Sequence, residues 1–239
     1  MSRRDPFQAR PVTSRRGGPT KDPLSRDVIV TAALDLLTRQ GAEGTSLRKV
    51  AAALDTGPAT LYAYVDDLQE LQALVLDRAL GEVRTAGAGD WRRRLLALLE
   101  SYFEALSRRP GLAQLAMNAI AVGPNALRIM EALLGQLDEA GMEDATAAWA
   151  VDLLLLYVTA VAAEHGPRRG KPDPLAGAAR ALDKVSAATH PRVHALRGQM
   201  LAGDGPARFA WSIEVLLQGL LRTPPAAPPR SPRKSSRRR

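Results

Sequence analysis

The 239-residue chain contains no cysteine, which excludes disulfides and thiolate metal sites. Cysteine usage therefore gives no indication of the redox compartment of the protein. Only 4% of the residues are aromatic, and only three are histidine. His190 and His194 have the one-turn spacing of a metal pair, but no third ligand is evident nearby, and a solvated face after Pro191 is the alternative. No glycine-rich phosphate loop follows a strand, because no strand-like alternation is present. We therefore expect no cofactor, no metal and no catalytic residue.

The sequence also lacks an apolar leader. Residues 1–18 are charged and polar without a hydrophobic run, so we expect no secretory signal and a cytoplasmic location. One apolar run, residues 145–163, approaches the length of a membrane span, but Asp152 interrupts it. A carboxylate in mid-span is costly in lipid, so we expect a buried helix in an all-helical protein or its dimer interface, and no membrane contact.

Positive charge is concentrated at the two ends of the chain. Residues 1–26 hold seven Lys or Arg against two Asp, and residues 223–239 hold six Lys or Arg and no acid. The remaining body is slightly acidic, although the whole chain has a net charge of +8. We expect disordered basic tails over 1–23 and 223–239. Such tails either add attraction to nucleic-acid phosphates or only keep the protein soluble.

Residues 45–65 form the most informative stretch, TSLRKVAAALDTGPATLYAYV. Ser46 is a good N-cap for a first short helix, and the Asp55-Thr56-Gly57 segment interrupts the helical pattern with turn-forming residues. Pro58 suits the first turn of a second helix, which we expect over 58–65. Leu61 and Val65 lie four residues apart and face inward, which leaves the other residues of that helix outward or flanking. This pattern is typical of a helix-turn-helix that enters a major groove.

Helical periodicity continues on both sides of this stretch, so we expect an all-α fold. Ser25 is a candidate cap for a helix that ends at Gly41, and Asp66-Asp67 begin another with acids suited to a helix N-terminus. Further helices are expected over 91–108, 110–122, 125–140, 143–165, 174–188, 191–202 and 206–221.

About forty residues between Ser25 and Leu80 resemble, in order and spacing, the DNA-binding domain of the TetR family of bacterial repressors. The matching motifs are Ile29-x3-Ala33-Leu34-x-Leu36-Leu37, Gly41-x2-Gly44, Leu47-Arg48-Lys49-Val50-Ala51, Ala59-Thr60-Leu61-Tyr62-x-Tyr64-Val65 and Leu68-x2-Leu71-x2-Leu74. The resemblance implies a DNA-binding domain over 24–85 that includes a linking helix. It also implies a ligand-binding and dimerisation domain over 86–222.

The second helix of the motif, expected over 58–65 and called the reading helix below, supplies most of the candidate DNA contacts. Thr60, Tyr62 and Tyr64 carry hydroxyls that reach phosphates or a base edge, while Pro58 and Ala59 are small enough for contact with a thymine methyl. Arg48 matches a position that reads guanine in some relatives, although a phosphate contact is equally plausible, and Lys49 is a weaker candidate. Many relatives have a backbone-binding lysine at the start of the linking helix. Asp66-Asp67-Leu68 stand there in this chain, so that anchor is missing or comes from the tails.

The resemblance implies a homodimer and a small-molecule inducer held among the later helices. Helices 143–165 and 206–221 are more apolar than one buried face needs, so they are the candidates for pairing with a second copy; otherwise they are internal core helices. Candidate ligand contacts are the polar, soft or aromatic residues in otherwise apolar helices, although each alone also fits ordinary packing. They are Tyr102, Met117, Asn118, Asn125, Trp149, Asp152 and Tyr157.

The expected function is therefore a ligand-responsive transcriptional regulator, a repressor released from a palindromic operator by its inducer. Two alternatives stay open: a helical ligand-binding protein without an operator, and an architectural DNA binder that works mainly through its tails. A small helical enzyme is a third. Protection of one palindrome, as opposed to uniform coverage of DNA, separates these readings.

Overall fold

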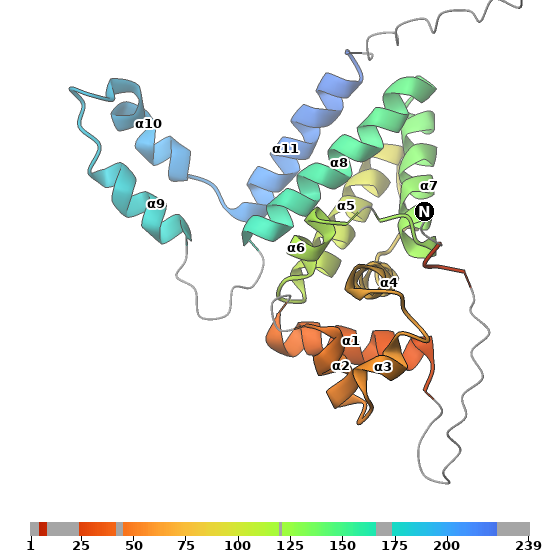
Figure 1. Cartoon of the computed structure of the whole chain (residues 1–239). Helices are drawn as coiled ribbons and strands as arrows, with labels where there is room; N and C mark the ends of the chain where they lie inside the picture. The colour runs from red at the N-terminus through yellow and green to blue at the C-terminus, as the bar shows by residue number, and fades with distance from the viewer. Residues whose placement is uncertain (1–4, 9–23, 42–44, 120, 166–173, 224–239) are drawn as a thin grey trace, which may run out of the picture.

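The structure, a computed structural model, describes residues 5–8, 24–41, 45–119, 121–165 and 174–223. The basic tails, for which we expected disorder and either attraction to DNA or a role in solubility, lie almost entirely outside these residues. The described chain is all-helical (Figure 1). Its helices are α1 (Arg26–Gln40), α2 (Leu47–Ala53), α3 (Pro58–Leu61), α4 (Leu68–Leu80), α5 (Trp91–Ser107), α6 (Leu112–Met117), α7 (Pro124–Glu139), α8 (Asp144–His165), α9 (Pro174–Asp183), α10 (Pro191–Leu201) and α11 (Gly205–Leu220).

Local capping explains where several of these helices begin. The hydroxyl of Ser25 accepts a hydrogen bond from the Val28 amide, and that of Ser46 accepts one from the Lys49 amide at 3.3 Å. Asp67 caps α4 in the same way, at 2.8 Å from the Glu70 amide. Each such cap is worth about 1 kcal/mol of helix stability. Gly41, with φ of 75°, ends α1 in a conformation that a side chain would strain.

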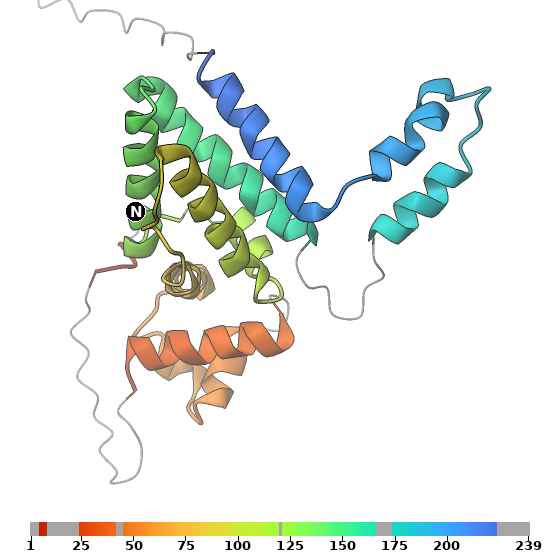
Figure 2. The ribbon, with the colours of Figure 1, turned by 180° about the vertical axis from the view of Figure 1, so that it is seen from behind.

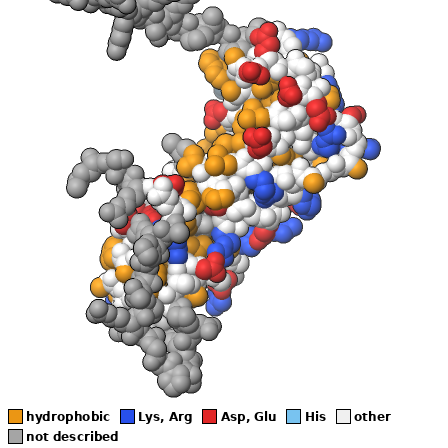
Figure 3. All heavy atoms as spheres, turned by 90° about the vertical axis from the view of Figure 1, so that its right-hand side faces the viewer, with side chains coloured by type: hydrophobic (Ala, Val, Ile, Leu, Met, Phe, Trp, Pro, Cys, Tyr) orange, Lys and Arg blue, Asp and Glu red, His pale blue; other side chains and the backbone are white. Residues whose placement is uncertain are grey.

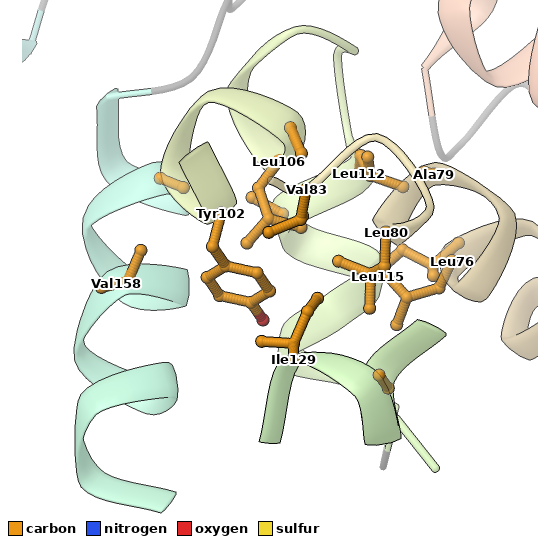
Figure 4. Packing of buried hydrophobic residues seen from close by; sticks show 14 of the residues in the cluster. Leu76, Ala79, Leu80, Val83, Tyr102, Leu106, Leu112, Leu115, Ile129 and Val158 are labelled. Carbon is orange, nitrogen blue, oxygen red and sulfur yellow. The ribbon is translucent and has the colours of Figure 1, made fainter. Parts of the chain in front are cut away.

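Two lobes share the linking helix α4. The first three helices pack together at one end of the molecule, and α4 lies between them and the larger bundle of α5–α8 and α11 (Figure 1). Apolar side chains from α4, α5, α6 and α7 converge at this junction (Figure 4). Those with almost no exposed area include Leu76, Leu80, Leu106, Leu112 and Ile129. This packing gives α4 a large buried contact with the core.

Two parts of the bundle are less covered. Helices α8 and α11 bury one side in the core and expose large apolar side chains on the other, among them Trp149 and Trp211, which are 65% and 68% exposed. By length and composition alone, α8 would also be long enough to cross a membrane. The α9–α10 hairpin stands away from the bundle in both ribbon views (Figures 1 and 2), and no residue of α10 is buried.

Three expected helices are shorter than the sequence pattern predicts. The helix expected over 174–188 is only α9, which ends at Asp183. The helix expected over 110–122 is only α6, which ends where the Asn118 side chain donates to the Gln114 carbonyl at 2.8 Å. The reading helix expected over 58–65 ends at Leu61, and a tight turn follows. Each error concerns the C-terminal end of a short helix, where the apolar periodicity covers too few residues to show which residue is the last.

Candidate DNA interface and ligand site

Helices α2 and α3 form a helix-turn-helix. Asp55, with φ of 50°, and the hydrogen bond from the Thr56 amide to the Ala51 carbonyl at 2.9 Å close the turn between them. Gly57 then stands at the N-cap of α3, and Pro58 occupies its first position, as the sequence predicts. Val50 and Leu61 are fully buried and attach the two helices to the domain core.

The turn after α3 places Tyr64 differently from our expectation. The amides of Tyr64 and Val65 both donate to the Leu61 carbonyl, at 2.9 and 3.0 Å, so the chain tightens toward three residues per turn. Leu61 and Tyr64 therefore share one face, and Tyr64 joins the core with 6% of its surface exposed. The expectation that Tyr64 faces outward to DNA was wrong.

The other candidate DNA contacts lie on an accessible surface. Tyr62 is 55% exposed, Thr60 is half-buried, and the remaining four, Arg48, Lys49, Pro58 and Ala59, are exposed. The Lys49 ammonium donates to the Gln40 side chain at 3.1 Å, which holds it beside the end of α1. These six residues come from α2 and α3 and define what we call the reading surface. Their contact with DNA stays a prediction.

Arg26 was not predicted as a functional residue from the sequence. It fixes the turn that follows α3, next to the reading surface. Its guanidinium donates to the Tyr64 carbonyl at 3.1 Å and pairs with the Glu70 carboxylate at 2.5 Å. Glu70 also accepts a hydrogen bond from the Asp66 amide. The acidic residues at the start of α4 therefore stabilise the N-terminus of that helix. No local pattern marks Arg26, because Tyr64 and Glu70 lie 38 and 44 residues away from it.

The candidate ligand residues do not gather in one cavity. Met117, Asn118, Trp149 and Asp152 are exposed, and Asn125 lies beside α4. Asp152 shares the exposed outer face of α8 with Trp149, so neither residue faces the interior of the bundle. Tyr102 and Tyr157 alone of the seven lie within the helical bundle.

Tyr102 is buried between α5 and α8 (Figure 4). Its hydroxyl lies 3.0 Å from the Thr159 hydroxyl, which itself donates to the Leu155 carbonyl at 2.7 Å. Because a threonine hydroxyl has one proton, Tyr102 is the donor in this pair. Burial raises the pKa of Tyr102 above its ordinary value, against the smaller opposite effect of the Thr159 hydrogen bond. The phenol is therefore a neutral hydrogen-bond donor inside the bundle.

An aromatic cluster lies next to Tyr102. The centroid of the Phe209 ring of α11 lies 5.5 Å from that of Phe103 and 6.3 Å from that of Tyr157. The rings of Phe209 and Tyr157 are stacked. Separately, α5 and α11 border a groove of about 300 Å³. Half of its lining is apolar and half is charged: Leu96, Ala210, Ile213 and Leu217, with Asp90, Arg92, Arg93 and Glu214.

A pair of reciprocal caps joins α4 to α7. The buried Asp77 carboxylate of α4 accepts from the amides of Asn125 and Ala126, at 3.0 and 3.1 Å, and from the Asn125 side chain at 3.0 Å. In return, Arg128 of α7 donates to the carbonyls of Val83 and Leu80 at the end of α4, at 3.0 and 3.3 Å. Negative charge at a helix start and positive charge at a helix end are both favourable. These hydrogen bonds attach the start of α7 to the end of α4.

Family models match both lobes of the chain. Residues 29–67 match the bacterial regulatory proteins of the tetR family, and residues 85–223 match the tetracyclin repressor-like C-terminal domain. The HTH-type transcriptional repressor DrrR1 of Streptomyces coeruleorubidus is 31% identical over 87% of this chain and 82% of its own length.

Solved structures share the fold over nearly the whole bundle. SCO7704 of Streptomyces is 42% identical, with a TM-score of 0.74 over 87% of this chain and all of its own. ActR of Streptomyces coelicolor in complex with actinorhodin is 32% identical, with a TM-score of 0.76 over 84% of this chain and 98% of its own. The chain belongs to the TetR family of ligand-responsive, DNA-binding transcriptional regulators.

Proposed function

We propose that this regulator is a repressor that binds a palindromic operator as a homodimer and leaves it when an inducer occupies the helical bundle. The observation that carries the proposal is the reading surface: an exposed set of small, hydroxylated and cationic side chains on a helix-turn-helix whose other face is fully buried. Side chains of this kind contact phosphates and base edges in a major groove. In this proposal the protein acts in the cytoplasm.

Each reading residue has a separate task in the proposal. Tyr62 and Thr60 donate hydroxyl hydrogen bonds to phosphates, and Pro58 and Ala59 approach a thymine methyl. Arg48 reads guanine or contacts a phosphate, and Lys49 adds charge at the edge. On the face in Figure 3, acidic and basic side chains are interspersed over the core.

The outer face of α8 and α11 is the proposed dimer interface. Trp149, Leu153 and Leu156 follow at spacings of four and three residues along α8, and all are exposed; Trp211 and Val215 form a similar row on α11. A row of large apolar side chains on two adjacent helices is the pattern that a four-helix bundle buries. Leu196 and Met200 of α10 are exposed as well. A two-fold partner would also place two reading surfaces to match a palindrome.

The inducer site is proposed between α5, α8 and α11. Tyr102 and Tyr157, the two sequence candidates inside the bundle, flank it, and the Phe103–Phe209 cluster supplies aromatic walls. ActR, whose structure holds actinorhodin, supports an organic ligand for this fold. To release DNA, the ligand must bind the released conformation more tightly than the operator-binding one.

A gel shift on DNA upstream of the gene and its neighbours tests the proposal. The wild type should bind one fragment specifically, and Arg48→Ala and Tyr62→Ala should weaken that binding. Equal binding by both variants would show that the reading surface is misassigned. A thermal-shift screen of apolar and cationic compounds should find a ligand that also weakens DNA binding; hits that leave DNA binding unchanged would argue against induction.

A further inference from the structure

A short segment ahead of α1, Asp5–Gln8, lies against the junction of the two lobes. It begins in a small turn in which the Phe7 amide donates to the Asp5 carboxylate at 2.9 Å. The Arg26 guanidinium holds the segment by donating to the carbonyls of Pro6 and Gln8, at 2.7 and 3.0 Å. In the ribbon views the segment lies beside the first turn of α7 (Figures 1 and 2).

Phe7 places its ring on the joint between α4 and α7. A Cβ atom added to Gly123, the N-cap of α7, would lie 2.6 Å from Cε1 of Phe7 and 2.3 Å from Cγ of Asp77. The ring, the carboxylate and the glycine backbone are therefore packed together without room for a side chain. Phe7 and Asp77 also border a groove of about 510 Å³ that includes Leu24, Tyr64 and Asn125. The Phe7 ring therefore packs on the glycine backbone at the point where the Asp77 carboxylate caps α7.

Arg26 connects this contact to the reading surface. The one guanidinium that binds the carbonyls of Pro6 and Gln8 also binds the Tyr64 carbonyl and the Glu70 carboxylate. A continuous path of contacts therefore runs from α7 through Phe7 and its backbone to Arg26 and the turn after α3. This path bypasses the length of α4, so it is a second connection between the lobes.

We propose that Asp5–Gln8 is a strap that fixes the orientation of the reading lobe on the core, with Phe7 and Arg26 as positioning residues for operator recognition. The inference rests on the proposed function for its consequence at DNA, but its structural part stands alone. A reading lobe held by α4 and the strap loses less freedom on binding than one held by α4 only. That smaller entropic cost gives tighter operator binding.

The test compares full-length Phe7→Ala with two controls, Phe7→Leu and Gln8→Ala. The leucine keeps an apolar side chain on the joint. Gln8 contributes only its backbone carbonyl to Arg26, so its alanine variant keeps the strap. None of the three changes alters charge, so affinity for non-operator DNA should be unchanged.

Two readouts decide the outcome. Hydrogen exchange at the Asn125 and Ala126 amides should become about tenfold faster in Phe7→Ala, because local opening of the cap becomes easier. The operator dissociation constant should rise about fivefold in the same variant by loss of preorganisation. Both controls should stay close to wild type.

Unchanged exchange at these two amides would overturn the strap itself. Faster exchange with unchanged or tighter operator binding would overturn its positioning role. If the wild type bound no operator at all, the proposed function would fail, and the exchange measurement would still decide whether the strap exists.

Discussion

Tyr62 and Tyr64 stand two residues apart in one turn, yet Tyr62 is 55% exposed and Tyr64 only 6%. The tightened turn after α3 separates the two phenols because it aligns Tyr64 with the buried Leu61. One tyrosine therefore faces the DNA side, and the other belongs to the core. Mutations at the two positions should have different effects.

Tyr62→Ala should weaken operator binding about tenfold, the loss of one hydrogen bond to a charged phosphate, with little change in unfolding free energy. Tyr64→Ala should lower the unfolding free energy by about 3–5 kcal/mol, the cost of a cavity at a buried aromatic. Gel shifts and urea unfolding of both variants check this. Equal loss of stability at the two positions would contradict the assignment.

The difference between these tyrosines shows what sequence reasoning can and cannot reach. Helix starts at Ser25, Ser46, Pro58 and Asp67 could be predicted, because a cap or an N1 proline acts on residues within one turn. The end of α3 could not, since four residues carry too little periodicity to distinguish an α-helix from a tighter turn.

Contacts between distant segments were likewise out of reach. The Asp77 caps on α7 and the contacts of Arg26 with Tyr64 and Glu70 join residues 38 to 49 positions apart, and no spacing rule pairs them. The outer faces of α8 and α11 were partly readable, because excess apolar surface is visible in composition. Trp149 and Asp152 were assigned to a ligand site, since periodicity alone does not say which apolar face turns inward.

Asp77→Ala should lower the unfolding free energy by about 2 kcal/mol, because it leaves two buried amides at the start of α7 without their acceptor. Asp77→Asn, which keeps one carbonyl oxygen, should lose less. Urea unfolding measures both. An alanine variant as stable as the wild type would show that the cap contributes nothing.

Trp211→Glu should convert the dimer to a monomer of 25.6 kDa, because it places a charge in the proposed interface of α8 and α11. Leu127→Glu is the matched control, since Leu127 is also exposed but lies on α7. Light scattering after gel filtration gives both masses. A wild type that is already monomeric, or a control that dissociates equally, would argue against this interface.

Tyr102→Phe should cost about 1 kcal/mol at pH 7, the net value of its hydrogen bond to Thr159. The pKa of Tyr102 is raised by burial, so the folded protein keeps this proton to a higher pH than the unfolded chain does. The wild type should therefore lose stability as the pH rises above about 10. The variant should lack that part of the decline, which urea unfolding at pH 7, 10 and 11 measures. Identical pH profiles would show that this phenol ionises as freely in the folded state.

The central claim is that two copies of the reading surface meet one palindrome. Footprinting on the DNA fragment bound by the wild type measures this directly, with Tyr62→Ala as the comparison. The account predicts two symmetric protected half-sites whose centres are about one helical turn, or a multiple of it, apart, and weaker protection of both half-sites by the variant. A single unpaired site, or even coverage of the whole fragment, would contradict it.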